Sequence, residues 1–182
     1  MRIQAMLMLV IVLASTSVPR LVYASTSEIF DANDTTPAYL DIVHAKVTDQ
    51  VGTGQISFMM ELAEAVPNPP ETGTFVAYNW QLDTDPSLAG IEFIIVVRWL
   101  YDHWETYVLD QRAFNQGTGD LVQVFLTDEV AFHGATEHIT IDAALLGDPS
   151  SFRWRSLTRD APAPAPFKDQ APDSSGWVDF SR

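Results

Sequence analysis

Apolar and polar residues alternate along most of this chain. The clearest run extends from Gln55 to Leu62, where every second residue from Ile56 onward is apolar. A period of two places alternate side chains on opposite faces of a strand, so this run predicts a half-buried β-strand. Seven further segments carry similar runs, most of them rich in β-branched and aromatic residues: Asp41 to Val47, Phe75 to Leu82, Ile91 to Arg98, Trp104 to Leu109, Leu121 to Leu126, Glu137 to Ile141 and Phe152 to Leu157.

Turn residues separate these predicted strands. Gly, Pro, Asn and Asp gather at residues 51–54, 67–70, 83–90 and 115–120, and such clusters are typical of tight connections. Asp142 to Leu146 is the only helical candidate, and Gly147 to Pro149 should end it after about one turn. About eight short strands at this spacing predict a single all-β, antiparallel domain, either a sandwich or a barrel.

Two of the predicted strands indicate how the sheets are layered. Ile91 to Val97 is apolar on both faces apart from Glu92, which predicts a central strand covered on each side. Phe152 to Arg155 alternates between aromatic residues and arginine, so its arginines are expected on an exposed face. Together with Arg159 they form the only cluster of basic residues, and the simplest interpretation is a strand face with solvated charges.

The two ends of the chain differ in composition from the predicted strands. Residues 1–24 carry an apolar run from Ala5 to Ala14 and a small residue at Ala24, the pattern of a signal peptide cleaved before Ser25. The alternative, a membrane anchor, needs an apolar run of roughly twice this length. At residues 160–182 alternating Ala and Pro followed by polar residues favour an extended C-terminal strap.

The chain is strongly acidic and contains no cysteine. It has 24 Asp and Glu against 10 Lys and Arg, and loss of Arg2 and Arg20 with the signal peptide would change the formal charge from −14 to −16. Nucleic acid is not expected as a partner, because phosphate backbones are bound by clustered Lys and Arg. Disulfides, thiolate metal sites and cysteine nucleophiles are excluded. The signal peptide predicts a secreted or periplasmic protein with no membrane insertion after cleavage.

Two carboxylates leave a predicted strand together at Asp83 and Asp85. A loop of this kind can aim both at one point, and calcium prefers about six to eight oxygen ligands. Asp31, Asp34 or loop carbonyl groups would have to complete the shell. The alternative is that Asp83 and Asp85 only cap the turn through hydrogen bonds to the backbone.

Aromatic residues cluster between the fourth and fifth predicted strands. Trp99, Tyr101 and Trp104 lie there with Asp102 and His103, and exposed aromatic rings beside hydrogen-bonding groups commonly hold sugars. These three residues are therefore the candidate ligand-binding residues. The alternative is that they pack in the core, as most aromatic residues of a sandwich do.

Support for catalysis is weak, and no catalytic residue is predicted. The four histidines lack a zinc-binding spacing, and neither a nucleophile elbow nor a phosphate-binding glycine loop occurs. Carboxylates that could serve a hydrolase are present, but their separation depends on strand order. They are Glu61, Glu92, Glu105 and Glu137.

Several short motifs follow one another in order over nearly the whole chain after residue 24: Phe30-Asp31, Pro37, Asp41-Ile42, Trp80 to Asp85, Gly90 to Phe93, Ile139 to Ile141, Leu145 to Gly147, Phe152 to Trp154 and Asp169 to Asp173. Their order resembles that of secreted DOMON-like domains related to family 9 carbohydrate-binding modules. The resemblance implies a jelly-roll-like β-sandwich and a binding role, with calcium or sugar recognition in some members. The pattern of the predicted strands itself places the sandwich domain at residues 25–159. The resemblance also implies a haem alternative, in which Met59 or Met60 pairs with His103, His133 or His138.

These observations lead to one expected function and three alternatives. The first expectation is an exported non-catalytic binding module for carbohydrate or another cell-surface component, with calcium as its candidate cofactor. The second is a structural or interaction domain of the cell envelope that has no small ligand. The other two alternatives are an exported glycan hydrolase and a haem-binding domain.

Overall fold

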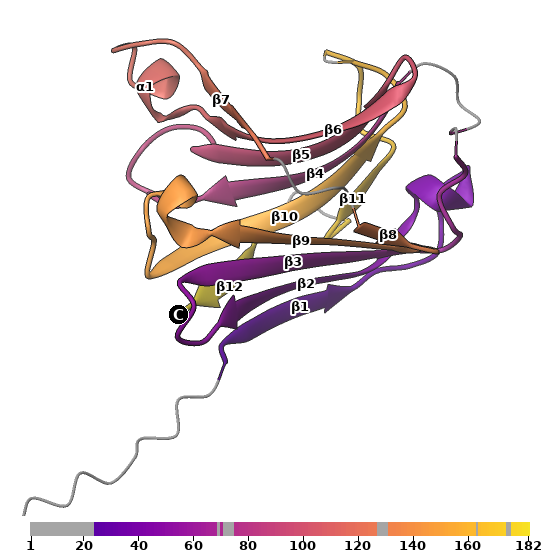
Figure 1. Cartoon of the computed structure of the whole chain (residues 1–182), viewed down its shortest axis with the longest axis horizontal. Helices are drawn as coiled ribbons and strands as arrows, with labels where there is room; N and C mark the ends of the chain where they lie inside the picture. The colour runs from indigo at the N-terminus through magenta and orange to yellow at the C-terminus, as the bar shows by residue number, and fades with distance from the viewer. Residues whose placement is uncertain (1–23, 69, 71–74, 127–130, 163, 174–175) are drawn as a thin grey trace, which may run out of the picture.

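The computed structural model describes residues 24–182 except 69, 71–74, 127–130, 163 and 174–175. The predicted signal peptide, apart from its last residue, lies outside the described residues. Two antiparallel sheets pack face to face as a β-sandwich, which Figure 1 shows as an upper and a lower layer. The predicted all-β sandwich is therefore confirmed. No helix in the described part of the chain has the length and apolar character that spanning a bilayer requires.

The lower layer in Figure 1 is a five-stranded sheet with the order β1-β2-β3-β9-β8. Its strands are β1 (Thr26–Phe30), β2 (Ile42–Gln50), β3 (Gln55–Leu62), β9 (Thr136–Asp142) and β8 (Ala131–His133). Alternation sets its faces: Ile56, Phe58 and Met60 of β3 are fully buried, whereas Gln55 and Glu61 are exposed.

The upper layer is a seven-stranded sheet with the order β11-β10-β4-β5-β6-β7, and β12 also pairs with β10. Its strands are β4 (Phe75–Asp83), β5 (Phe93–Leu100), β6 (His103–Asp110), β7 (Val122–Phe125), β10 (Ser151–Arg159), β11 (Asp169–Ala171) and β12 (Val178–Ser181). The sheet bends so that its outward face is concave, with α1 (Arg112–Asn115) and β7 rising on one side (Figure 1).

All eight predicted strands are present, as β2 to β7, β9 and β10, and four more complete the sheets. The predicted one-turn helix is a 3-10 helix at Ala143–Leu146, where Asp142 accepts a hydrogen bond from the N–H of Ala144 and Gly147 adopts a φ of 77°. A second such turn lies at Ala38–Leu40. The segment expected as a strap beyond the domain instead contributes β11 and β12 to the sheet, so the sandwich extends past residue 159.

One core joins the two sheets. The rings of Trp80 and Trp154 lie 5.5 Å apart, and Phe58 of the opposite sheet meets Trp80 edge-on at 5.4 Å. All three side chains are fully buried. Burial of each such ring contributes on the order of 2–3 kcal/mol, so this contact across the layers fixes how the sheets stack.

Candidate functional site

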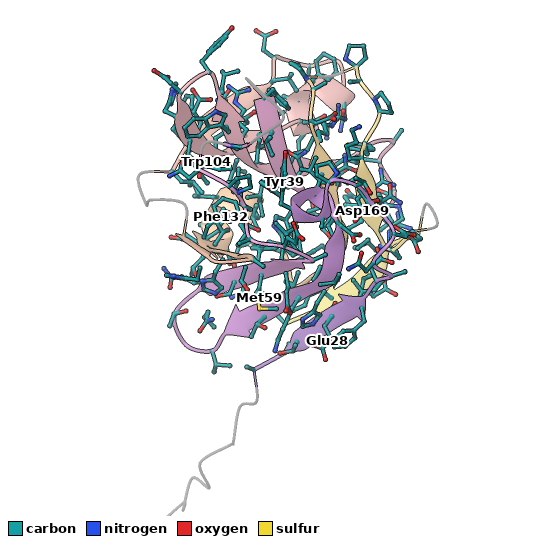
Figure 2. The ribbon with its side chains drawn as sticks, turned by 90° about the vertical axis from the view of Figure 1, so that its right-hand side faces the viewer. Glu28, Tyr39, Met59, Trp104, Phe132 and Asp169 are labelled. Atoms are coloured by element: carbon teal, nitrogen blue, oxygen red, sulfur yellow. The ribbon has the colours of Figure 1, made fainter. Side chains whose placement is uncertain are left out.

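Five aspartates from two segments of the chain meet at one end of the sandwich. Figure 2 looks onto this end, and Asp169 is labelled there. Asp169 begins β11, which contacts β2, and this contact brings the C-terminal segment against the start of the domain. The carboxylates form two groups of three, each with ligand atoms within 4.8 Å of one another, and both groups include Asp169: Asp31, Asp169 and Asp173; and Asp34, Asp41 and Asp169.

Backbone N–H groups hold several of these carboxylates in place. Asp169 accepts from the N–H groups of Ile42 at 2.6 Å and Gln170 at 2.8 Å. Asp41 Oδ1 accepts from the N–H of Asp34 at 3.3 Å. Asp31 Oδ1 accepts from the neighbouring N–H of Ala32 at 3.1 Å. Both oxygens of Asp169, and one oxygen each of Asp41 and Asp31, are thus oriented by the main chain.

The cluster carries negative charge that no cation of the described residues balances. None of the five carboxylates forms an ion pair with a described Lys, Arg or His, and the nearby Lys168 pairs with Asp160 instead. Burial raises the pKa of Asp31 to about 6, with further contributions from Asp173 and Asp169. Burial also raises the pKa of Asp169, and the charges of Asp41 and Asp34 add to this. Burial, and after it mutual repulsion, therefore opposes full ionisation of Asp31 and Asp169.

Two of the four predicted calcium ligands lie in this cluster, and two do not. Asp31 and Asp34 lie in the cluster, whereas Asp83 and Asp85 lie outside both groups of three. Asp83, buried at the end of β4, forms an ion pair with Arg153 of β10. Asp85 accepts from the N–H of Ser87 at 3.0 Å and from its hydroxyl at 2.6 Å, which is the turn-capping alternative.

Hydrogen bonds to Glu92 hold the loop after β4 in place, whereas the sequence offered this residue only as a candidate hydrolase carboxylate. Glu92 is 1% exposed, and its Oε2 accepts from the N–H groups of Thr84 at 2.8 Å and Asp85 at 3.4 Å.

The cluster residues Asp41, Asp169 and Asp173 were not among the predicted calcium ligands. The one feature of the sequence that could have drawn attention to these three residues is that they belong to the ordered motifs behind the family resemblance.

The predicted aromatic ligand site separates into core and surface. Trp99 is 8% exposed and stacks edge-on against Trp104, its partner on the adjacent strand, at 5.5 Å. Trp104 packs in turn on Phe132 at 4.9 Å, and both are labelled in Figure 2. Tyr101 is 72% exposed at the turn between the strands. Trp99 therefore packs in the interior, as the alternative expected, Trp104 is half-buried against the core, and Tyr101 alone projects outward.

The concave outward face of the seven-stranded sheet holds a hollow of about 210 Å³. Its floor is apolar and lies on the central strands, and Ile94 and Val96 of β5 are part of it. Amide and aromatic side chains border the floor. The amide, arginine and aromatic residues of the lining are Asn79, Gln81, Arg98, Tyr107, Arg159 and Phe167.

Four arginines gather on this face of an otherwise acidic protein. Register places Arg153, Arg155 and Arg159 of β10 on the same side as Arg98 of β5, so four of the ten Lys and Arg residues lie here. Two of the four have carboxylate partners: Arg98 pairs with Glu105 at 2.6 Å, and Arg153 pairs with Asp83.

The other two arginines of this face bind neutral groups. The Nε of Arg155 donates to Gln81 at 2.7 Å, and its guanidinium lies 4.6 Å from the centre of the Trp177 ring. Arg159 donates to the carbonyl group of Ala165 at 2.9 Å and lies 4.1 Å from the Phe167 ring. Burial lowers the pKa of both. Each guanidinium is stacked and oriented, and neither faces a carboxylate among the described residues.

The candidate hydrolase carboxylates do not converge. Glu61 projects from β3 on the outward face of one sheet, and Glu105 projects from β6 on the outward face of the other. Glu137 and Glu92 are 0% and 1% exposed.

The two candidate methionine ligands of a haem lie on opposite faces of β3, and the candidate histidines lie on three other strands. Met60 is fully buried in the core. Met59 faces outward, where its partner across the β3–β9 ladder is His138. His103 pairs with Asp102 at 3.0 Å and Glu105 at 3.3 Å on the other sheet, and His133 lies at the end of β8.

Comparisons with protein families, with curated proteins and with solved structures gave no match. The resemblance to DOMON-like domains therefore stays a prediction, and function is inferred from the two sites described above.

Proposed function

We propose that this protein is an exported, non-catalytic binding module that holds an acidic polysaccharide on the concave face of its seven-stranded sheet. Export is inferred from the composition of residues 1–24. The observation that carries the proposed binding is the hollow on that face, in which apolar, amide and arginine side chains converge.

The apolar floor is the first support for a ligand. Ile94 and Val96 alternate outward on a central strand, a position that usually requires a covering layer. They line an open hollow instead. Apolar surface of this kind suits the C–H faces of a sugar ring, and the ring of Tyr107 beside it adds an aromatic contact.

The polar groups around the floor suit a hydroxyl-rich ligand. Asn79 and Gln81 are each 7% exposed and stand next to the apolar residues of β5. Amide side chains both donate and accept hydrogen bonds, as sugar hydroxyl groups do. A few oriented polar groups over an apolar floor give a pocket its specificity.

The arginines favour an acidic sugar over a neutral one. Arg155 and Arg159 present stacked guanidinium groups that no described carboxylate neutralises. A planar guanidinium matches the geometry of a carboxylate and can bind it through two hydrogen bonds. Because the protein as a whole carries a net charge of −14, an anionic ligand requires such a local concentration of positive charge.

Affinity electrophoresis of the purified protein tests the proposal. We expect retention by polygalacturonate or alginate and weaker retention by neutral xylan or dextran. Arg155→Gln should weaken binding about tenfold or more, because it removes one charged, bidentate contact. Lys46→Gln makes the same change of charge on the opposite sheet and should leave binding unchanged. Absence of retention by every acidic glycan would favour a structural domain without a small ligand.

A further inference from the structure

We propose that a divalent cation with a preference for oxygen ligands, calcium above others, binds between the carboxylates of Asp34, Asp41 and Asp169. Asp31 and Asp173 lie beside this group and share Asp169 with it. The site is separate from the concave face and is inferred independently of the polysaccharide.

The spacing of the three carboxylates fits one ion. Calcium binds oxygen at roughly 2.3–2.6 Å, so two ligands on opposite sides of the ion lie about 4.6–5.2 Å apart. The ligand atoms of Asp34, Asp41 and Asp169 all lie within 4.8 Å of one another. The three ligand atoms are therefore close enough together for one calcium ion to lie between them.

A buried oxygen without a partner gives an independent reason to expect a ligand. Asp41 is 0% exposed, and its Oδ2 accepts no hydrogen bond from any described residue. Its Oδ1 is already occupied by the N–H of Asp34. A buried carboxylate oxygen that is neither hydrogen-bonded nor paired is costly, and a metal ion removes that cost.

The donor set selects the kind of ion. The five aspartates supply only hard oxygen atoms, which suit calcium and magnesium and disfavour metals that prefer nitrogen or sulfur. Magnesium usually keeps most of its water and takes one or two carboxylates, whereas calcium accepts several. Three carboxylates in one group, with two more alongside, therefore point to calcium.

The position of the site gives the ion a structural effect. Asp34 and Asp41 lie between β1 and β2, whereas Asp169 begins β11 near the C-terminal end of the chain. An ion bound by all three links the first strands of the five-stranded sheet to the last strands of the seven-stranded sheet. Binding to the folded state alone would raise the unfolding temperature with ion concentration.

Thermal unfolding and calorimetric titration of the EDTA-treated protein test this site. We expect 1 mM calcium to raise the unfolding temperature by roughly 5–10 °C if the dissociation constant is near 10 µM. Asp41→Asn and Asp169→Asn should remove both the shift and the heat of binding. In EDTA, Asp41→Asn should unfold at the same temperature as the native chain or higher, because it removes a repelling charge; this result distinguishes loss of a metal ligand from loss of folding.

Asp85→Asn is the matched control, since it alters an exposed aspartate outside the cluster. It should leave the calcium-dependent shift intact. Absence of any shift or heat up to 10 mM calcium would overturn the proposal, as would a full shift that persists in both Asp41→Asn and Asp169→Asn. Retention on acidic polysaccharide is measured separately in EDTA, so failure of one proposal is not mistaken for failure of the other.

Discussion

The indole N–H of Trp80 donates a hydrogen bond of 3.2 Å to Oε2 of Glu137, and neither side chain is exposed. Glu137 projects from β9 across the core to a residue of the opposite sheet, and its Oε1 has no described partner. Burial raises the pKa of this carboxyl from 4.5 to about 8, and the bond from Trp80 opposes only part of the increase. Glu137 is therefore held uncharged at neutral pH.

This relationship predicts that stability falls as pH rises from about 4.5 to 8. The folded protein keeps the Glu137 proton through this window while the unfolded chain releases it, so deprotonation favours unfolding. The full loss attributable to Glu137 is roughly 3–5 kcal/mol. Glu137→Gln should retain the bond from Trp80 and remove this dependence.

Denaturant unfolding at pH 5 and pH 8 measures the effect, and the difference between the native chain and Glu137→Gln isolates it from other titrating groups. Tyr78 is a titratable neighbour, and burial raises its pKa well above this range. The variant should gain stability relative to the native chain at pH 8. An equal difference in stability at the two pH values would contradict the prediction.

Asp83 and Arg153 form an ion pair, and substituting Arg153 should cost more stability than substituting Asp83. Asp83 is 4% exposed, whereas the side chain of Arg153 is 39% exposed and can be solvated alone. Arg153→Met should therefore destabilise by about 1–3 kcal/mol, because it leaves a buried carboxylate unpaired. Asp83→Asn should cost less, and the double variant should recover part of the loss of Arg153→Met. Equal costs for the two single variants, measured by urea unfolding, would contradict this order.

Much of the fold could be predicted because a period of two is visible in any strand long enough to show it. β3, with eight residues, is an example. β8 and β11 have three residues each, too few to display a period. These strands form because a longer neighbour offers an unpaired edge, as β10 does for β11 and β12. Alternating proline in the segment before β11 concealed this pairing.

The sites were less predictable, because they depend on contacts between distant segments. Asp31 and Asp34 could be selected as calcium ligands, but Asp169 reaches them only through the pairing of β11 with β10 and its contact with β2. Asp83 is expected to bind a metal because it leaves a predicted strand together with Asp85. Its actual partner, Arg153, lies 70 residues away, and the sequence does not show that the two meet. The apolar residues on both faces of β5 predicted a central strand covered on each side; the strand is central, but Ile94 and Val96 line the hollow on the outward face.

Substitution of Trp99 and of Tyr101, in the hairpin between β5 and β6, should change stability by very different amounts, because one ring is buried and the other is exposed. Trp99 is 8% exposed and packs on Trp104, so Trp99→Ala should destabilise by about 3–5 kcal/mol. Tyr101→Ala should change stability by less than about 0.5 kcal/mol, since this ring is 72% exposed. Both values can be measured by denaturant unfolding. Loss of polysaccharide retention in Tyr101→Ala, with stability unchanged, would instead indicate that the polysaccharide binds at this hairpin, as the sequence predicted.

Ionic strength should weaken the proposed polysaccharide binding through particular arginines. Attraction between solvent-exposed charges is screened over about 8 Å at 0.15 M salt, so retention on alginate should fall as sodium chloride is raised. Arg155 and Arg159 have no described carboxylate partner and should each contribute to this dependence. Arg98 is already paired with Glu105, so its charge is largely neutralised and Arg98→Gln should change the salt dependence less.

The dissociation constant of each variant, measured at 50, 150 and 500 mM salt, separates these contributions. The plot of its logarithm against that of salt concentration should become shallower in Arg155→Gln and Arg159→Gln. Arg155→Lys should keep the slope of the native chain, because it keeps the charge. It should still bind more weakly, since an ammonium group cannot reproduce the planar pair of hydrogen bonds. Equal slopes in all the variants would mean that the acidic ligand is held elsewhere.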